Sequence, residues 1–148
     1  MNPPSKILVP TDFSSQAEYA LDYACELAAK LDATVSILSV LGVPSLGVPE
    51  LGAAMTASVI DDMIKDNQAG LDSLADARRS IAKIDQVLLR TGDARDMIPN
   101  VAEEIGADLI VMGTHGRRGL SRALLGSVAE YVVRVSRVPV LTVRAKKS

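Results

Sequence analysis

Apolar residues along the chain follow two kinds of pattern that alternate from one end to the other. Short continuous runs, typical of strands covered on both faces, span residues 6–10, 33–40, 85–92, 107–113 and 138–144. Longer segments, in which apolar residues recur every three or four positions, span residues 14–32, 58–83, 96–106 and about 127–135. The pattern therefore predicts five strands that alternate with four helices.

Strict alternation of strands and helices predicts an α/β fold built from parallel βαβ units. Right-handed crossovers then give a single-domain, open, doubly wound parallel sheet, and a length of 148 residues suits one domain. Ligands of such sheets bind beyond the carboxyl ends of the strands, where the strand order reverses. We therefore expect binding or catalytic residues among those that directly follow each strand.

Capping and breaker residues refine these boundaries. Ser15, with Glu18 three residues later, predicts a capping box at the start of the first helix. The segment 41–57 repeats Leu-Gly-Val-Pro and predicts a long loop that covers part of a site. Pro99 would be costly inside the third helix, so we expect either a helix that starts at Asp96 as N-cap or a local kink.

Composition narrows the class of protein. A net charge of −2 and a pI near 5.4 give no sign of a nucleic-acid or anionic-membrane partner. Cys25 is the single cysteine, which excludes an internal disulfide, and its place on the first helix predicts burial. No apolar run reaches the roughly 18 residues of a membrane span. We expect a cytoplasmic protein without nucleic-acid or membrane partners.

The stretch GTHGRRGLSRALLGSVAEYVVR, which begins at Gly113, joins the fourth strand to the last helix. Its glycines fall as Gly113-x2-Gly116-x9-Gly126-Ser127. Backbone N–H groups in a glycine turn and at a helix start both favour anions, so the two ends could hold a chain of phosphates. No Lys-Ser/Thr pair follows as in a Walker A loop. The alternative is that the glycines only shape a turn and begin a helix.

With this spacing the sequence resembles the universal stress protein family, specifically its ATP-binding branch with the signature G-x2-G-x9-G-[ST]. KILVPTDFS near the start, and GADLIVMG with the stretch that follows it, resemble the family in order and position. The resemblance implies a Rossmann-like sheet of the adenine nucleotide α-hydrolase type, with strand order 3-2-1-4-5. That order places the first and fourth strands side by side at the reversal point.

The resemblance also implies a nucleotide site. Pro10 and Thr11 would line the adenine or ribose pocket, Asp12 would face ribose or a metal ion, and Val40 would contact the base through its backbone. Asp12 has an alternative role as the cap of a turn. The remaining members of the predicted site surround the ribose and phosphates: Met112, Gly113, Thr114, His115, Gly116, Arg117, Gly126, Ser127, Val128 and Ala129.

The charged residues of the glycine stretch have two interpretations. Arg117, Arg118 and Arg122 could pair with phosphate oxygens, or they could simply be solvated. His115 is the single histidine, and a lone loop histidine is typically exposed. No catalytic partner for it is identifiable, so the sequence gives no sign of a catalytic triad.

The resemblance implies an ATP-binding, nucleotide-responsive regulator of the stress response with little or no catalysis. ATP would bind together with Mg²⁺ or Mn²⁺, and ADP and AMP are alternatives to it. A slow ATPase or a nucleotidyl-transfer enzyme is the alternative function. A phosphoacceptor receiver domain fits less well, since no loop follows the last strand to supply its lysine. The apolar edge strand 138–144 predicts a homodimer, because pairing with a second copy would cover it.

Overall fold

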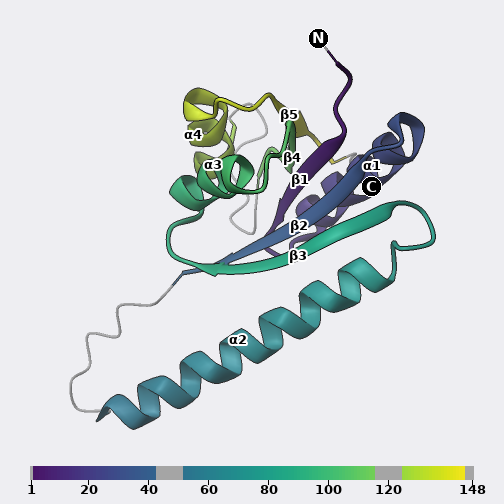
Figure 1. The fold of residues 1–148 in the computed structure, drawn as a ribbon. Coiled ribbons are helices and arrows are strands. Elements are labelled where there is room, and N and C mark those ends of the chain that lie inside the picture. The colour runs from purple at the N-terminus through teal and green to yellow at the C-terminus, as the bar shows by residue number, and fades with distance from the viewer. Residues whose placement is uncertain (1, 43–51, 116–124, 146–148) are drawn as a thin grey trace.

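A computed structural model describes residues 2–42, 52–115 and 125–145. Helices and strands alternate as the sequence predicts (Figure 1): β1 Lys6–Thr11, α1 Ser15–Leu31, β2 Thr34–Leu41, α2 Gly52–Asp76, β3 Lys83–Thr91, α3 Ala94–Glu104, β4 Leu109–Gly113, α4 Ser127–Val135 and β5 Val140–Val143.

All four strand pairs are parallel, and the strands lie in the order β3-β2-β1-β4-β5, which confirms the predicted sheet. The strand order reverses between β1 and β4, where Ile7 pairs with Leu109 and Leu8 with Ile110. The carboxyl ends of these two central strands therefore lie side by side, which is where doubly wound sheets bind ligands.

Helices cover both faces of the sheet, and each face has its own core (Figure 1). In β1, Ile7 and Val9 pack with α1 and α2, whereas Leu8 packs with α3 and α4. This alternation follows from the two-residue period of a strand and explains the continuous apolar run 7–10 within β1. Cys25 belongs to the α1–α2 core and is 1% exposed, which confirms its predicted burial.

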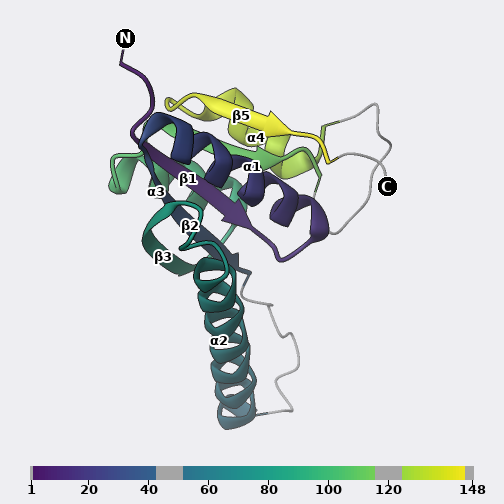
Figure 2. The same cartoon turned by 90° about the vertical axis from the view of Figure 1, so that its right-hand side faces the viewer.

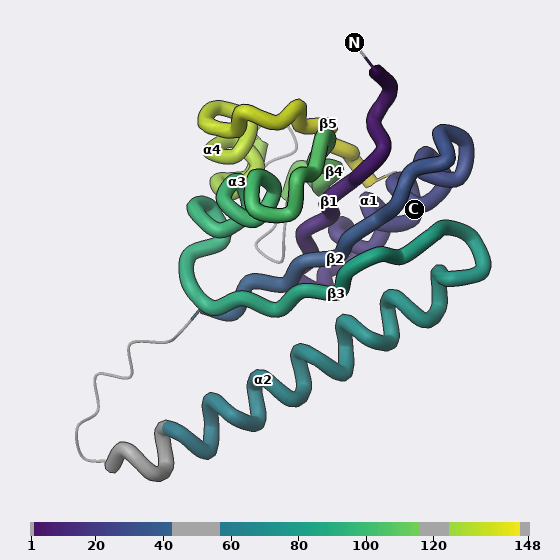
Figure 3. Tube along the Cα trace, in the orientation of Figure 1, coloured from purple at the N-terminus to yellow at the C-terminus, as the bar shows by residue number. Residues whose placement is uncertain are grey.

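The N-terminal part of helix α2 extends away from the body of the protein (Figures 2 and 3). Its C-terminal half packs on the sheet through Leu71 and Ala75. These two are the fully buried side chains among those described in α2. The helix is therefore anchored near its C-terminal end.

The helix starts differ from prediction at two places. Ser14, and not Ser15, caps α1, because the Ser14 hydroxyl accepts a 3.1 Å hydrogen bond from Ala17 N. Asp93, and not Asp96, caps α3 by accepting from Arg95 N at 2.9 Å, so Pro99 lies inside the helix. The cap and the buried face of α3 offset the hydrogen bond that proline cannot donate.

The limits of α2 also differ from the predicted helix 58–83. The helix begins at Gly52, so residues 52–57 are helical although they fall in the predicted loop. It ends at Asp76, and residues 77–82 form a turn in which Ile81 N and Ala82 N both donate to Arg78 O. Ile81 is 51% exposed, so it continued the helical spacing without belonging to a buried face. Most of the predicted covering loop lies in residues 43–51, outside the described residues.

Among the described helices, we find none with both the length and the apolarity that a bilayer crossing requires.

Candidate functional site

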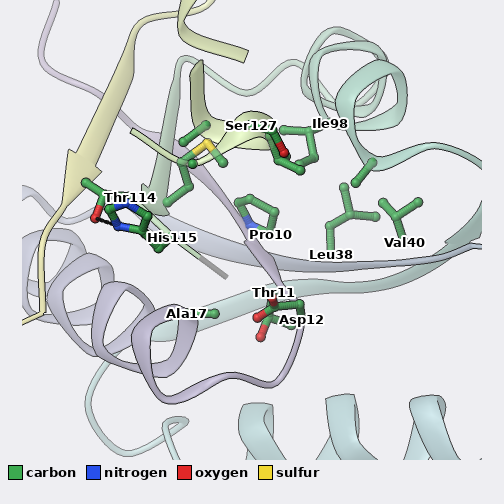
Figure 4. Close-up of a pocket in the computed structure, with 16 residues that line it drawn as sticks. Pro10, Thr11, Asp12, Ala17, Leu38, Val40, Ile98, Thr114, His115 and Ser127 are labelled. Carbon is green, nitrogen blue, oxygen red and sulfur yellow. Dashed lines mark hydrogen bonds between the residues drawn. The ribbon is translucent and has the colours of Figure 1, made fainter. Parts of the chain in front are cut away.

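A cavity of about 550 Å³ opens at the carboxyl ends of β1 and β4, where the strand order reverses (Figure 4). Its volume falls within the roughly 300–1,000 Å³ of typical ligand sites. The cavity is lined by Pro10, Thr11, Asp12, Ala17, Leu38, Val40, Ala94, Ile98, Met112, Gly113, Thr114, His115, Gly126, Ser127, Val128 and Ala129.

Most residues of the predicted site come together around this cavity. Twelve of them line it: Pro10, Thr11, Asp12, Val40, Met112, Gly113, Thr114, His115, Gly126, Ser127, Val128 and Ala129. The other two, Gly116 and Arg117, lie outside the described residues, as do Arg118 and Arg122. The segments that supply the lining are far apart in the sequence, and the parallel topology brings them together.

The turn between β1 and α1 forms one side of the cavity. The Thr11 hydroxyl oxygen accepts a 3.0 Å hydrogen bond from Phe13 N, and Asp12 Oδ1 accepts one of 3.0 Å from Ser14 N. Thr11 is buried and Asp12 is exposed. Asp12 therefore stabilises its own turn and also lines the cavity, so the two roles considered for it are compatible.

Gly126 closes the opposite side by bringing the start of α4 against the end of β4. Gly126 N donates a 2.7 Å hydrogen bond to Thr114 O, and Thr114 N donates to Val143 O of β5 at 3.3 Å. A Cβ on Gly126 would lie 2.7 Å from Thr114 O and 3.3 Å from His115 Cα. Both neighbours are backbone atoms, so this junction leaves no room for a side chain.

The first turn of α4 borders the cavity without a side-chain cap. Gly126 is the N-cap and has no side chain that could accept from the helix N–H groups. The first N–H groups of a helix lack intrahelical partners, so those of Ser127, Val128 and Ala129 can donate to a ligand. The helix dipole adds positive potential at the same place, which favours an anion.

His115 differs from the exposed loop histidine that the sequence predicts. It is half-buried, and its Nδ1 lies 3.1 Å from the hydroxyl oxygen of Thr114. Its Nε2 is buried and has no hydrogen-bond partner among the described residues. A buried ring nitrogen without a partner lacks the hydrogen bond that buried polar groups usually make.

The sequence analysis missed four apolar residues of the lining: Ala17, Leu38, Ala94 and Ile98. Leu38, Ala94 and Ile98 form an apolar wall of the cavity. Leu38 lies two residues before Val40 and therefore on the same face of β2, a signal that could have identified it. Ala94 and Ile98 lie four residues apart on α3 and share one helix face. Because that helix was predicted to start at Asp96, Ala94 was placed outside it.

A shallower recess adjoins this wall at the ends of β2 and β3, where it shares Val40 and Ala94 with the main cavity. Asp93 lines the recess and forms a 3.2 Å ion pair with Arg95. Hydrogen bonds from the Arg95 side chain and backbone N–H lower the pKa of the Asp93 carboxyl below its usual value. In the described part of the chain, no group of three or more His, Cys, Asp or Glu side chains is placed to hold a metal ion.

The fold and the site together define a doubly wound α/β protein with a ligand-sized cavity at its switch point. The model of the universal stress protein family matches residues 4–144. The chain therefore belongs to the universal stress protein family.

Two archaeal relatives from Methanocaldococcus jannaschii are similar over almost the whole chain. Universal stress protein MJ0531 is 36% identical over 147 residues, which cover 96% of this chain and 83% of that protein. Universal stress protein MJ0577 is 29% identical over 157 residues, which cover 97% of this chain and 96% of that protein. The similarity therefore includes the strands and the glycine junction.

Solved structures support the same fold. The structure of MJ0577 superposes with a TM-score of 0.82 at 30% identity and covers 97% of this chain and 98% of its own. A universal stress protein solved in complex with cAMP superposes with a TM-score of 0.67 at 26% identity and covers 95% of this chain and 97% of its own.

Proposed function

We propose that the chain binds ATP in the cavity at the switch point, with ADP and AMP as alternative ligands. The observation that carries this proposal is the glycine-capped start of α4, whose N–H groups border a ligand-sized cavity. A phosphate chain would accept hydrogen bonds from these groups and from the Ser127 hydroxyl. The related protein solved with cAMP supports an adenine nucleotide as the ligand class.

The opposite end of the cavity suits a nucleobase. Leu38, Val40, Ala94 and Ile98 give it apolar walls, which can pack against both faces of a flat ring. These side chains carry no hydrogen-bonding group, so the polar edge of the base would be bound by backbone groups, among them those of Val40. Sugar and phosphates would then extend from this wall toward α4.

Asp12 suits a divalent ion that accompanies the phosphates. Mg²⁺ is commonly held by one or two carboxylates together with substrate phosphates, so a single aspartate in the lining is enough. Asp12 Oδ1 accepts from Ser14 N, which fixes the orientation of the carboxylate at the edge of the cavity. Asp12 would hold Mg²⁺ or Mn²⁺, and the ion would neutralise charge on the bound phosphates.

We propose a regulatory role in the stress response, with little or no catalysis. Hydrolysis needs a positioned water, a base and charge neutralisation in the transition state. Of the described lining residues, Asp12 and His115 carry the titratable side chains, and Asp12 is assigned to the metal ion. A slow ATPase remains the alternative, with His115 Nε2 as the group to test first. A single cytoplasmic domain is part of the same proposal.

We also propose that the chain forms a homodimer through the segment 138–144. Strand β5 is an edge of the sheet, and Val140, Leu141 and Thr142 are half-buried. An apolar edge strand has unpaired backbone groups that a second copy could satisfy. Sedimentation at micromolar concentration should give the dimer mass, and a monomer throughout would refute this assembly.

Thermal unfolding with and without ATP tests the proposed ligand. At ~100 times the dissociation constant, ATP should stabilise the fold by about 2.7 kcal/mol. For a domain of this size the melting temperature should rise by roughly 5–11 °C. GTP at the same concentration serves as the control for the base. An unchanged melting temperature with saturating ATP and Mg²⁺ would refute the proposal.

A further inference from the structure

The aromatic ring of Phe13 lies against Gly70 of α2. A Cβ on Gly70 would lie 2.9 Å from Phe13 Cε1, 3.3 Å from Cζ and 3.4 Å from Cδ1. The 2.9 Å distance is shorter than real Cβ contacts, so the missing side chain makes the room that the ring occupies. Glycine is unfavourable inside a helix, and a packing role of this kind explains its presence there.

Phe13 itself has an unusual backbone conformation. Its φ is 64°, in the left-handed region that bulky residues seldom adopt. Neighbouring hydrogen bonds hold this conformation, since Phe13 N donates to Thr11 and Ser14 N donates to Asp12. Strained residues of this kind persist where the surrounding structure determines them, frequently at binding sites. The turn that Phe13 completes carries Thr11 and Asp12, two residues of the cavity lining.

The contact lies at the border of the anchored part of α2. Leu71, the next residue after Gly70, is fully buried in the core that Phe13 also contacts. None of the described α2 side chains before Leu71 is fully buried. Figure 2 shows the corresponding end of the helix standing away from the sheet. Phe13 therefore connects the wall of the cavity to the point where α2 leaves the body.

We infer that Phe13 is a positioning residue for the nucleotide site and that its ring, seated on Gly70, couples the site to helix α2. The ring holds the turn in the conformation that presents Asp12 to the cavity. Binding at Asp12 in turn favours the seated ring, because coupling between two sites is reciprocal. This inference rests on the proposed binding of ATP.

A double-mutant cycle on Phe13 and Gly70 tests the coupling, with the dissociation constant of Mg·ATP measured by calorimetry. Gly70→Ala displaces the ring and should raise the constant roughly tenfold, within the usual range of coupling between sites. Phe13→Ala removes the ring and should have a similar effect. The double variant should bind no more weakly than Phe13→Ala, since the two changes disrupt one contact. Ser73→Ala, at an exposed position of the same helix, should bind like the wild type.

Hydrogen exchange separates positioning from a general loss of stability. ATP should slow amide exchange in residues 57–76 of the wild type several-fold, and this protection should disappear in Phe13→Ala at saturating ATP. Wild-type affinity in both single variants, additive effects, or unchanged protection in Phe13→Ala would overturn the inference while ATP binding stands. A wild-type protein that does not bind ATP would refute the proposed function, and the inference with it.

Discussion

Gly126 N donates a 2.7 Å hydrogen bond to Thr114 O, and this bond joins the start of α4 to the end of β4. The two residues lie near opposite ends of the segment from Gly113 to Ser127, yet their backbones are in direct contact. The helix start is thereby held at the mouth of the cavity, where its N–H groups can reach a ligand.

Substitution of Gly126 should abolish the response to ATP. Gly126→Ala places a Cβ 2.7 Å from Thr114 O, so the helix start must move away from the strand end. Gly126→Val should act in the same way and more strongly. We expect no ATP-induced rise in melting temperature, with a native circular dichroism spectrum because the change affects the junction and leaves the helices and strands themselves intact.

Gly42→Ala is the matched control, because a Cβ at Gly42 meets no atom of the described residues within 4 Å. This variant should keep the wild-type shift in melting temperature. A full ATP response in Gly126→Val would show that the junction is not needed for binding.

Asp12→Asn should weaken the contribution of the metal ion while preserving the turn. The asparagine oxygen can still accept from Ser14 N, whereas the charge that favours Mg²⁺ is lost. We expect Mg²⁺ to strengthen ATP binding in the wild type about tenfold more than in the variant, equivalent to ~1.4 kcal/mol. Titration of ATP with Mg²⁺ or with EDTA measures this difference. Equal dependence on Mg²⁺ in both proteins would exclude Asp12 as a ligand.

Arg78 should be important for stability. Its side chain is 7% exposed and joins the end of α2 to α1, with Nε 2.8 Å from Asp22 and Nη2 3.0 Å from Glu18. Arg78→Ala removes these bonds and the packing of a buried side chain, so the free energy of unfolding should fall by about 2–3 kcal/mol. Urea denaturation gives the value.

The neighbouring Arg79 supplies the control for that measurement. It is 53% exposed and pairs with Asp76 on the surface, so Arg79→Ala should change the free energy of unfolding by at most about 0.5 kcal/mol. Equal losses in Arg78→Ala and Arg79→Ala would contradict the role given to the buried guanidinium.

Asp108 should make the stability of the fold depend on pH in the acidic range. Burial alone would raise the pKa of this carboxyl, but hydrogen bonds from the backbone N–H groups of Ser5 and Lys6 and from the Ser5 hydroxyl lower it overall. A carboxyl with a lowered pKa in the folded state stabilises the fold above its unfolded value near 3.9. This stabilisation is lost as the pH falls through the lower, folded value.

Asp108→Asn should therefore cost about 1 kcal/mol at neutral pH, and this cost should shrink as the pH falls through the lowered pKa of the wild-type carboxyl. Denaturation at several pH values measures the difference between the two proteins. A difference that is the same at every pH would contradict the assignment.

The sequence predicted the sheet correctly because continuous apolar strands and amphipathic helices alternate without interruption. It was less successful at element ends. The N-cap of α3 was misplaced because Pro99 was weighed against the helix, whereas the Asp93 cap and the buried Ile98 favour it. The limits of α2 were misplaced because helix breakers precede Gly52 and exposed Ile81 continues the apolar spacing.

Residues with distinctive chemistry were easier to place around the cavity than apolar ones. Glycines and polar residues after strand ends stand out, and among them Thr11, Asp12, Gly113 and Thr114 line the cavity. Leu38 could have been inferred from Val40 on the same face of β2, but Ile98 is an ordinary core residue by pattern, and its place in the wall depends on how α3 packs over β2. That packing is a tertiary property without a local signal.

A crystal structure of the protein with ATP and Mg²⁺ would test the central claim most directly. We predict phosphate oxygens within hydrogen-bond distance of the backbone nitrogens at residues 127–129 and a base against Val40, Ala94 and Ile98. An empty cavity at saturating ATP, or a nucleotide bound elsewhere on the protein, would contradict the account.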